Sequence, residues 1–374
     1  MKQERYINNM SNFVKLHQMT TKNIVKNYDF IDTMRFIAMI GIVMEHSSPF
    51  LGLKLNTLHD QIIQTVSLQF IKFGTIVFFI LAGFLIGDKF NQYTTKQYLG
   101  RRLNTTFRPW IFWVTVFIIL FYIDQGVRYL KHSDALGFKH PLEYIYDRIH
   151  FIIVQTSFWF IINFMLCITI LLVFRKYMYN LTFGIILGLL SLFYSVNLYY
   201  DWIPTGHTTA LLGFVFYLWL GVILHKYFDK YNEWVGKQPF WLLSGAVLIT
   251  FILSCAETIN LIHLGSNDSG NTLRFSNIIF SLVSFLFLYK YCNFQAIEKL
   301  KPRSMTFGIH LLHHILIIIF LPMILRPLKI VYTNESVWSL FFLQFAIFIL
   351  IYASTYAIVY YIGKSKKWKW TVGQ

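Results

Sequence analysis

Charged residues are scarce in this chain. Asp, Glu, Lys and Arg make up 13% of its 374 residues, whereas hydrophobic residues make up 56%. Soluble domains average about 25% charged residues, so this composition excludes an ordinary soluble core and is typical of a membrane protein. Carboxylates are the scarcer of the two charges, with 17 acidic against 33 basic residues, and the net charge is +16.

Cysteine is nearly absent, and no linker or repeat divides the chain. The three cysteines lie in hydrophobic stretches without metal-ligand spacing, at Cys167, Cys255 and Cys292. We therefore expect neither a disulfide framework nor a metal site, and we interpret these residues as small packing groups. The lack of a Gly/Ser/Pro-rich linker, and of the internal repeats found in many transporters, predicts a single membrane domain.

Long hydrophobic stretches are what the chain does contain. Ten of them have membrane-spanning length, with approximate limits 30–51, 66–88, 107–126, 149–174, 181–200, 207–225, 239–262, 273–292, 305–325 and 338–362. We predict an all-α, polytopic membrane protein with about ten transmembrane helices. The expected division is a cytoplasmic arm over 1–28, a transmembrane domain over 29–363 and a basic cytoplasmic tail over 364–374.

The basic residues are distributed unevenly between the two sides of the predicted membrane domain. If the loops are assigned alternately to the two sides, most of the 33 basic residues fall on the side that holds both termini. The positive-inside rule then predicts that both termini are cytoplasmic, in a multi-pass protein of the cell membrane. We attribute the excess positive charge to topology and to contact with anionic lipid, and we expect no nucleic-acid partner.

The first hydrophobic stretch carries two basic groups. Arg35 and His46 are eleven residues apart, which is about three helical turns and roughly 16 Å, so they share one helix face. An intramembrane Arg costs at least about 2.5–3.5 kcal/mol and indicates a functional site. Asp32, one turn before Arg35, is placed to pair with its guanidinium. The alternative is an interfacial pair that anchors the helix end. Arg35 and His46 together suggest that an anionic molecule enters for proton-transfer chemistry.

Several motifs, in order along the chain, resemble the acyltransferase-3 family of integral-membrane enzymes that acylate sugars and glycans. The first is Asp32-x-x-Arg35 followed by ten residues and His46. The others are Phe78 to Ile86 (with Ala82 where Ser is usual), Tyr98 to Arg102 with Pro109-Trp110, Trp159-Phe160, Leu220 to Val222, and Phe307 to His313 (with His310 where Tyr is common). The resemblance spans about residues 28–325, and it implies a cytoplasmic acyl-CoA donor that enters a pore between the helices.

The basic residues near the cytoplasmic face suit the phosphates of CoA. We predict that Arg35, Arg101 and Arg102 contact them, because a guanidinium matches phosphate geometry. The family usually has a further basic residue after the Arg pair, where this chain has Asn104 and Thr105, and Arg108 is our candidate replacement. Simple anchoring by positive-inside charge is the alternative for Arg101 and Arg102. By resemblance His313 lines the donor pore, and helix packing is its alternative.

We predict that His46 is the general base, with Asp32 and Arg35 completing the catalytic set. An imidazole with a pKa near 6.5 suits proton transfer at neutral pH. The transfer would be direct, although Ser47 or Ser48 leaves a covalent route open. His310, His313 and His314 lie within two turns, but we expect no metal because that stretch offers no carboxylate or thiol ligand.

Three further residues are candidates for binding the acceptor near the outer face, namely Glu45, Trp159 and Glu257. The alternative for Glu45, which its position favours, is a place at the outer interface, and the alternative for Glu257 is a side chain that reaches out to water. The predicted function is O-acylation, with an acetyl or succinyl group passing from acyl-CoA to a hydroxyl of a cell-surface or lipid-linked glycan in a bacterial envelope. The alternative is a polysaccharide or glycolipid exporter or flippase. The oligomeric state stays open, and a homodimer is compatible with the sequence.

Overall fold

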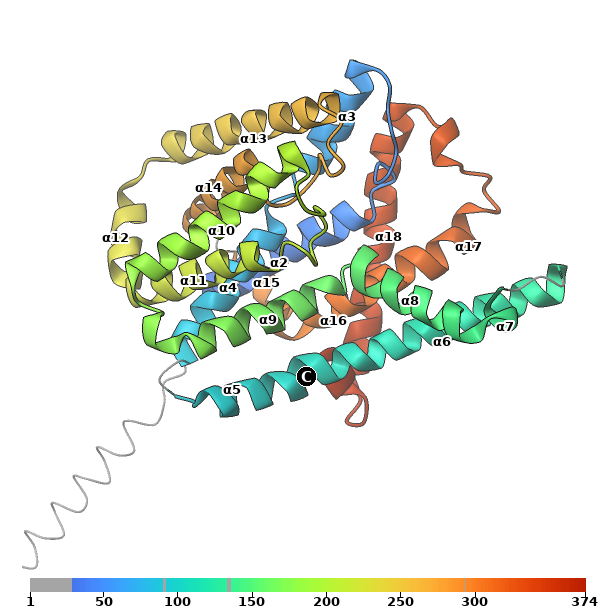
Figure 1. Ribbon diagram of the computed structural model, residues 1–374, viewed down its shortest axis with the longest axis horizontal. Coiled ribbons are helices and arrows are strands. Elements are labelled where there is room, and N and C mark those ends of the chain that lie inside the picture. The colour runs from blue at the N-terminus through green and yellow to red at the C-terminus, as the bar shows by residue number, and fades with distance from the viewer. Residues whose placement is uncertain (1–28, 90–91, 133–135, 293) are drawn as a thin grey trace, which may run out of the picture.

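The computed structural model describes residues 29–89, 92–132, 136–292 and 294–374, and the predicted arm over 1–28 lies outside them. The described residues are helical, without strands (Figure 1). The main helices are α2 (Asp29–His46), α3 (Leu58–Gln69), α4 (Gly74–Lys89), α5 (Thr95–Arg102), α6 (Arg108–His132), α8 (Pro141–Gln155), α9 (Trp159–Val173), α10 (Leu181–Tyr200), α11 (Leu211–Lys226), α12 (Phe228–Lys237), α13 (Phe240–His263), α14 (Phe275–Tyr291), α16 (Pro302–Ile315) and α18 (Val337–Lys364). Shorter elements are α7 (Leu136–Lys139), α15 (Gln295–Glu298) and α17 (Leu321–Leu325), with π-helical turns at Leu103–Phe107 and Leu316–Phe320.

Each of the ten predicted stretches contains helix, and the all-α prediction is confirmed. Six helical segments of the described chain are long and apolar enough to cross a membrane alone, and two bent pairs raise that number to eight. The bent pairs are α8 with α9, at 66°, and α11 with α12, at 89°. The apolar α14 is shorter. The structure is therefore that of a multi-pass membrane protein, and the count of ten spans stays a prediction.

Glycine allows the two central helices α4 and α11 to touch along their backbones. A Cβ atom at Gly83 would lie 1.9 Å from the carbonyl oxygen of Leu218, and one at Gly221 would lie 2.0 Å from that of Ile80. Small residues permit this close approach, a common way to pack helices within a membrane. These glycines belong to two of the motifs that carry the family resemblance. At these positions the two motifs therefore serve the packing of α4 against α11.

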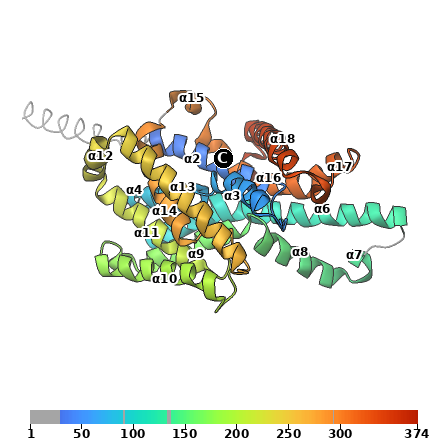
Figure 2. The same cartoon turned by 90° about the horizontal axis from the view of Figure 1, so that it is seen from above.

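Helix α2 is the element around which the site is built. It packs against α4, α16 and α18, while α6 and α8 run to one side of the bundle (Figures 1 and 2). The chain end after α18 folds back against α6 and α16, where the Trp113 indole N–H donates to the Thr371 carbonyl at 2.8 Å. Thr371 and Val372 are buried. Part of the predicted tail 364–374 is thus packed into the body of the protein.

Candidate active site

Arg35 and His46 both lie on helix α2, and Asp32 contacts Arg35. The Arg35 guanidinium lies 3.4 Å from the Asp32 carboxylate. The same carboxylate lies 3.6 Å from the Arg303 guanidinium, at the start of α16. Two guanidiniums therefore share the Asp32 carboxylate at this end of α2.

A cavity of about 260 Å³ opens between these residues and the interior. Three guanidiniums line it, from Arg35, Arg102 and Arg303, and its lining residues include no carboxylate. The remaining walls are mostly apolar: Met39, Ile42, Phe78, Leu81, Ala82, Leu85, Thr105, Thr106, Phe160, Ile161, Phe164, Thr306, Phe307, His310 and Gly373. A cationic entrance followed by an apolar passage suits a long molecule that is anionic at one end.

The other two predicted phosphate contacts, Arg101 and Arg108, lie outside the cavity lining. The Arg101 side chain is exposed and donates to the Tyr93 hydroxyl at 2.7 Å. Arg108 is exposed and stacks over the Trp370 ring, 4.4 Å from its centroid. Neighbouring residues of a helix point about 100° apart, which explains why Arg102 faces the cavity while Arg101 does not.

Arg303 is a cavity residue that the sequence motifs do not single out, because it is one of many basic residues on the side of both termini. A signal was present in the sequence. Arg303 precedes His310 by seven residues, which is close to two helical turns and places both on one face of α16. Both side chains line the cavity.

Three histidine rings lie close together near this cavity. The ring centroid of His46 lies 4.4 Å from that of His314 and 5.5 Å from that of His313, and the latter two are 4.9 Å apart. One ring nitrogen from each lies within 4.8 Å of the other two. His310 lines the cavity and its ring lies 5.7 Å from that of His313. His46, His313 and His314 form what we call the histidine cluster, and His310 lies between this cluster and the cavity.

The two serines beside His46 have hydrogen-bond partners. The Ser47 hydroxyl donates to the backbone carbonyl of Val43. The Ser48 hydroxyl donates to the side-chain oxygen of Gln344 at 2.8 Å, and both serines are buried. These bonds connect the end of α2 to its surroundings and give neither serine a contact with an imidazole.

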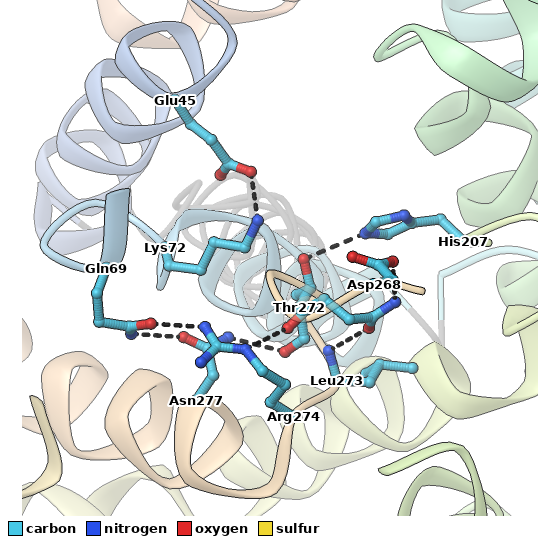
Figure 3. A network of polar contacts seen from close by, with 10 residues as sticks. Glu45, Gln69, Lys72, His207, Asp268, Thr272, Leu273, Arg274 and Asn277 are labelled. Atoms are coloured by element: carbon cyan, nitrogen blue, oxygen red, sulfur yellow. Dashed lines mark hydrogen bonds and ion pairs between the residues drawn. The ribbon is translucent and has the colours of Figure 1, made fainter. Parts of the chain in front are cut away.

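A polar network begins at Glu45, the residue before His46 (Figure 3). Glu45 forms a partly buried ion pair with Lys72 at 2.5 Å. Farther along, the fully buried Arg274 donates to the Gln69 side chain at 2.6 Å and to the Ser254 carbonyl at 2.8 Å. Glu45 thus lies at the boundary between the cluster and this network.

Trp159 lies near the same network. Its ring centroid is 4.4 Å from that of His207, which belongs to the loop between α10 and α11. His207 in turn lies 3.3 Å from the Thr272 hydroxyl, and burial lowers the pKa of His207 because it disfavours the charged imidazolium. A neutral imidazole beside an indole gives an amphipathic surface in this part of the protein.

Glu257 has a structural environment of its own. Its carboxylate accepts hydrogen bonds from the backbone N–H of Ser276 at 2.8 Å, from that of Phe275 at 3.2 Å and from the Tyr199 hydroxyl at 2.8 Å. A carboxylate that caps the first turn of α14 stabilises that helix. Its predicted contact with an acceptor stays a prediction.

The comparison with protein families agrees with this arrangement. The profile of the acyltransferase-3 family, described as an acyltransferase domain, matches residues 28–364. Comparisons with curated proteins and with solved structures found no match. The family match covers nearly the whole chain, including the helices that carry the arginines and the histidine cluster. The chain belongs to the acyltransferase-3 family and is a multi-pass membrane acyltransferase.

Proposed function

We propose that this protein transfers an acetyl or succinyl group from cytoplasmic acyl-CoA to a hydroxyl of a cell-surface or lipid-linked glycan at the plasma membrane. The observation that carries the proposal is a cavity lined by three guanidiniums and by His310, whose ring lies 5.7 Å from that of His313 in the histidine cluster. The alternative, an exporter or flippase, gives no reason for an arginine-lined cavity to end at grouped imidazoles.

The cavity suits the two chemical parts of acyl-CoA. Its phosphates are anionic, and guanidiniums bind phosphate through charge-assisted hydrogen bonds. The pantetheine arm is long and thin, and it would pass between apolar walls such as Phe78, Phe160 and Phe164. Arg303 at the exposed mouth and Arg35 farther in would hold the phosphates, and the thioester would then reach the histidine cluster.

His46 would act as the general base in a direct transfer. Its ring would accept the proton of the acceptor hydroxyl while that oxygen forms a bond to the thioester carbonyl carbon. The carbon–sulfur bond then breaks, and the thiolate of CoA takes the proton from His46. No acyl-enzyme forms, which agrees with the hydrogen bonds that engage Ser47 and Ser48 elsewhere.

The acceptor would approach from the side of the Glu45–Lys72 pair, opposite the donor cavity. Positive charge gathered on the side of both termini favours the cytoplasm for that side, and so for the arginines. Trp159 offers an aromatic face to a sugar ring, and Glu45 offers a carboxylate to sugar hydroxyls. Donor and acceptor would then meet at His46 from opposite sides of the membrane.

The proposal is tested by CoA release from acetyl-CoA. The purified protein in nanodiscs is given extracted cell-wall glycan, and His46→Ala and Arg35→Ala are measured beside it, with the exposed Arg326→Ala as the control. We expect His46→Ala to abolish turnover and Arg35→Ala to weaken donor binding. Glycan binding without CoA release or donor binding in the wild-type protein would contradict the enzyme and favour the exporter.

A further inference from the structure

The hydrogen bonds of His313 determine which of its two ring nitrogens carries the hydrogen. Its Nδ1 lies 3.0 Å from the backbone carbonyl oxygen of Ile309. A carbonyl oxygen only accepts, so Nδ1 carries the hydrogen and donates it. In the neutral ring Nε2 is then a lone pair, and this buried atom has no hydrogen-bond partner among the described residues.

The adjacent His314 has the opposite arrangement. Two groups of Ser157 contact the Nδ1 of His314: the backbone N–H donates to it at 3.2 Å, and the side-chain hydroxyl oxygen lies 2.9 Å away. The hydroxyl can donate or accept, whereas the N–H can only donate, so the N–H decides that Nδ1 is an acceptor. That N–H is free for this contact because the chain bends by 66° between α8 and α9, where it makes no helical hydrogen bond. An Nδ1 that accepts carries no hydrogen, so in the neutral ring the hydrogen of His314 is on Nε2.

We propose that His314 uses this Nε2–H to stabilise the negative oxygen that develops on the thioester carbonyl, and that Ser157 is the positioning residue that keeps the hydrogen there. The inference rests on the proposed acyl transfer. His314 is the closer of the two rings to His46, at 4.4 Å between centroids. A donor held in place before the reaction stabilises an oxyanion effectively in a site that excludes water.

The neighbouring ring cannot perform this role. His313 presents a lone pair at Nε2, which would repel an oxyanion. Two adjacent histidines of one helix therefore contribute opposite hydrogen-bonding groups to the cluster, and the tautomers come from the backbone of two different elements, α16 and the bend before α9.

The same tautomers argue against a cation held by all three rings. A metal ligand must offer a lone pair to the ion. His314 has its Nδ1 engaged by Ser157 and a hydrogen on Nε2, so His46 and His313 are the two rings of the cluster that can offer one. The nitrogens lie within 4.8 Å of one another, and we assign that grouping to proton and oxyanion chemistry.

The electron and proton balance of the step is simple. The acceptor oxygen attacks the carbonyl carbon as its proton moves to His46, and the carbonyl π electrons move to the oxygen, which accepts the hydrogen bond from His314 Nε2. When the carbonyl re-forms, the carbon–sulfur bond breaks and sulfur takes the proton from His46. His314 keeps its hydrogen throughout.

Nitrogen NMR of the full-length protein in nanodiscs, labelled with ¹⁵N-histidine, tests the tautomers without an activity assay. Protonated and unprotonated ring nitrogens have well-separated shifts, and His313→Asn and His314→Asn assign the signals by their loss. We expect hydrogen on Nε2 of His314 and on Nδ1 of His313. The same tautomer in both rings, or a metal-shifted His314 nitrogen with stoichiometric metal in the protein, would overturn the proposal.

Kinetics with a matched pair of variants tests the role. Gln places an amide N–H near the Nε2 position, whereas Asn reaches only the Nδ1 position. We expect His314→Asn to lower kcat by about 10²–10³-fold, as for loss of an oxyanion donor. His314→Gln should recover part of this loss, with acetyl-CoA affinity unchanged in both, and the exposed His263→Asn is the control.

The outcomes separate this inference from the proposed function. Wild-type kcat in His314→Asn, or a change in donor affinity alone, would overturn the role of His314 while His46→Ala still abolished turnover. No CoA release by the wild-type protein would overturn the proposed function, and the catalytic role of His314 with it.

Discussion

Arg274 in the polar network and the pair Arg35 and Arg303 beside the cavity differ in how their donors are used. Arg274 is fully buried and donates to the Gln69 side chain, to the carbonyls of Ser254 and Asn271 and to the Thr258 hydroxyl. In contrast, Arg35 and Arg303 share the single carboxylate of Asp32 beside a cavity.

The difference separates a structural arginine from a binding one. A guanidinium has five donors, and neutral oxygens of the protein can satisfy them when the group serves the fold. Guanidiniums that line an open space are suited to a ligand that brings negative charge. This contrast supports our proposal that the cavity binds the anionic donor and that the network of Figure 3 stabilises the fold.

The largest expected effect is on stability, from removal of the satisfied arginine. Arg274→Met should lower the free energy of unfolding by about 3 kcal/mol, because it leaves the Gln69 oxygen and the Ser254 carbonyl buried without a donor. Thermal unfolding followed by tryptophan fluorescence in detergent measures the change, with the half-exposed Arg128→Met as control. Equal melting temperatures for the two variants would contradict a structural role for Arg274.

Removal of a cavity arginine should affect ligand binding and leave the fold intact. We expect Arg35→Gln and Arg303→Gln each to raise the Kd for acetyl-CoA about 10–100-fold, since a charge-assisted hydrogen bond is worth about 1.5–3 kcal/mol. Isothermal titration calorimetry measures the affinity, and Arg326→Gln is the control. Unchanged affinity in both cavity variants would place the phosphates elsewhere.

Salt provides a smaller and independent effect. Donor binding should weaken between 50 mM and 500 mM salt, because ions screen charges that are exposed at the mouth of the cavity. The dependence should be shallower in Arg303→Gln, whose side chain is largely exposed in the wild-type protein. Titrations of acetyl-CoA at several salt concentrations measure the slopes, and identical slopes would argue against a phosphate contact at Arg303.

The smallest expected effect comes from the predicted contact that lies outside the cavity. Arg101→Gln should change the Kd for acetyl-CoA by less than about twofold, because the guanidinium is exposed and bonded to the Tyr93 hydroxyl. Calorimetry on this variant beside Arg303→Gln makes the comparison direct. If Arg101→Gln lost as much affinity for acetyl-CoA as Arg303→Gln, positive charge near the mouth of the cavity would matter more for binding than a place in the cavity lining.

The sequence predicted the helices and the local contacts well. Membrane-spanning length is encoded in continuous apolar stretches, and the Asp32–Arg35 contact follows from helical spacing alone. Arg102 was also predicted to meet the donor, but its separation from Arg101 depends on the rotation of α5 against the cavity, which no local pattern encodes.

The contacts between distant segments could not be read from the sequence. His46 meets His313 and His314 because α2 packs against α16, and that packing is set by tertiary contacts. The bend at Ser157 could not be predicted either, because the stretch 149–174 reads as one apolar segment. In the structure the helix is interrupted there, and the backbone N–H of Ser157 points toward His314.

Photo-crosslinking with an acyl-CoA analogue that carries a photoreactive group on its acyl chain tests the central claim most directly. Mass spectrometry of the labelled protein would locate the acyl end. We expect the label on α2 near His46 and on α16 near His313, competed by acetyl-CoA and reduced in Arg35→Gln. Labelling confined to other helices, or labelling that acetyl-CoA does not compete, would contradict a donor path from the arginines to the histidine cluster.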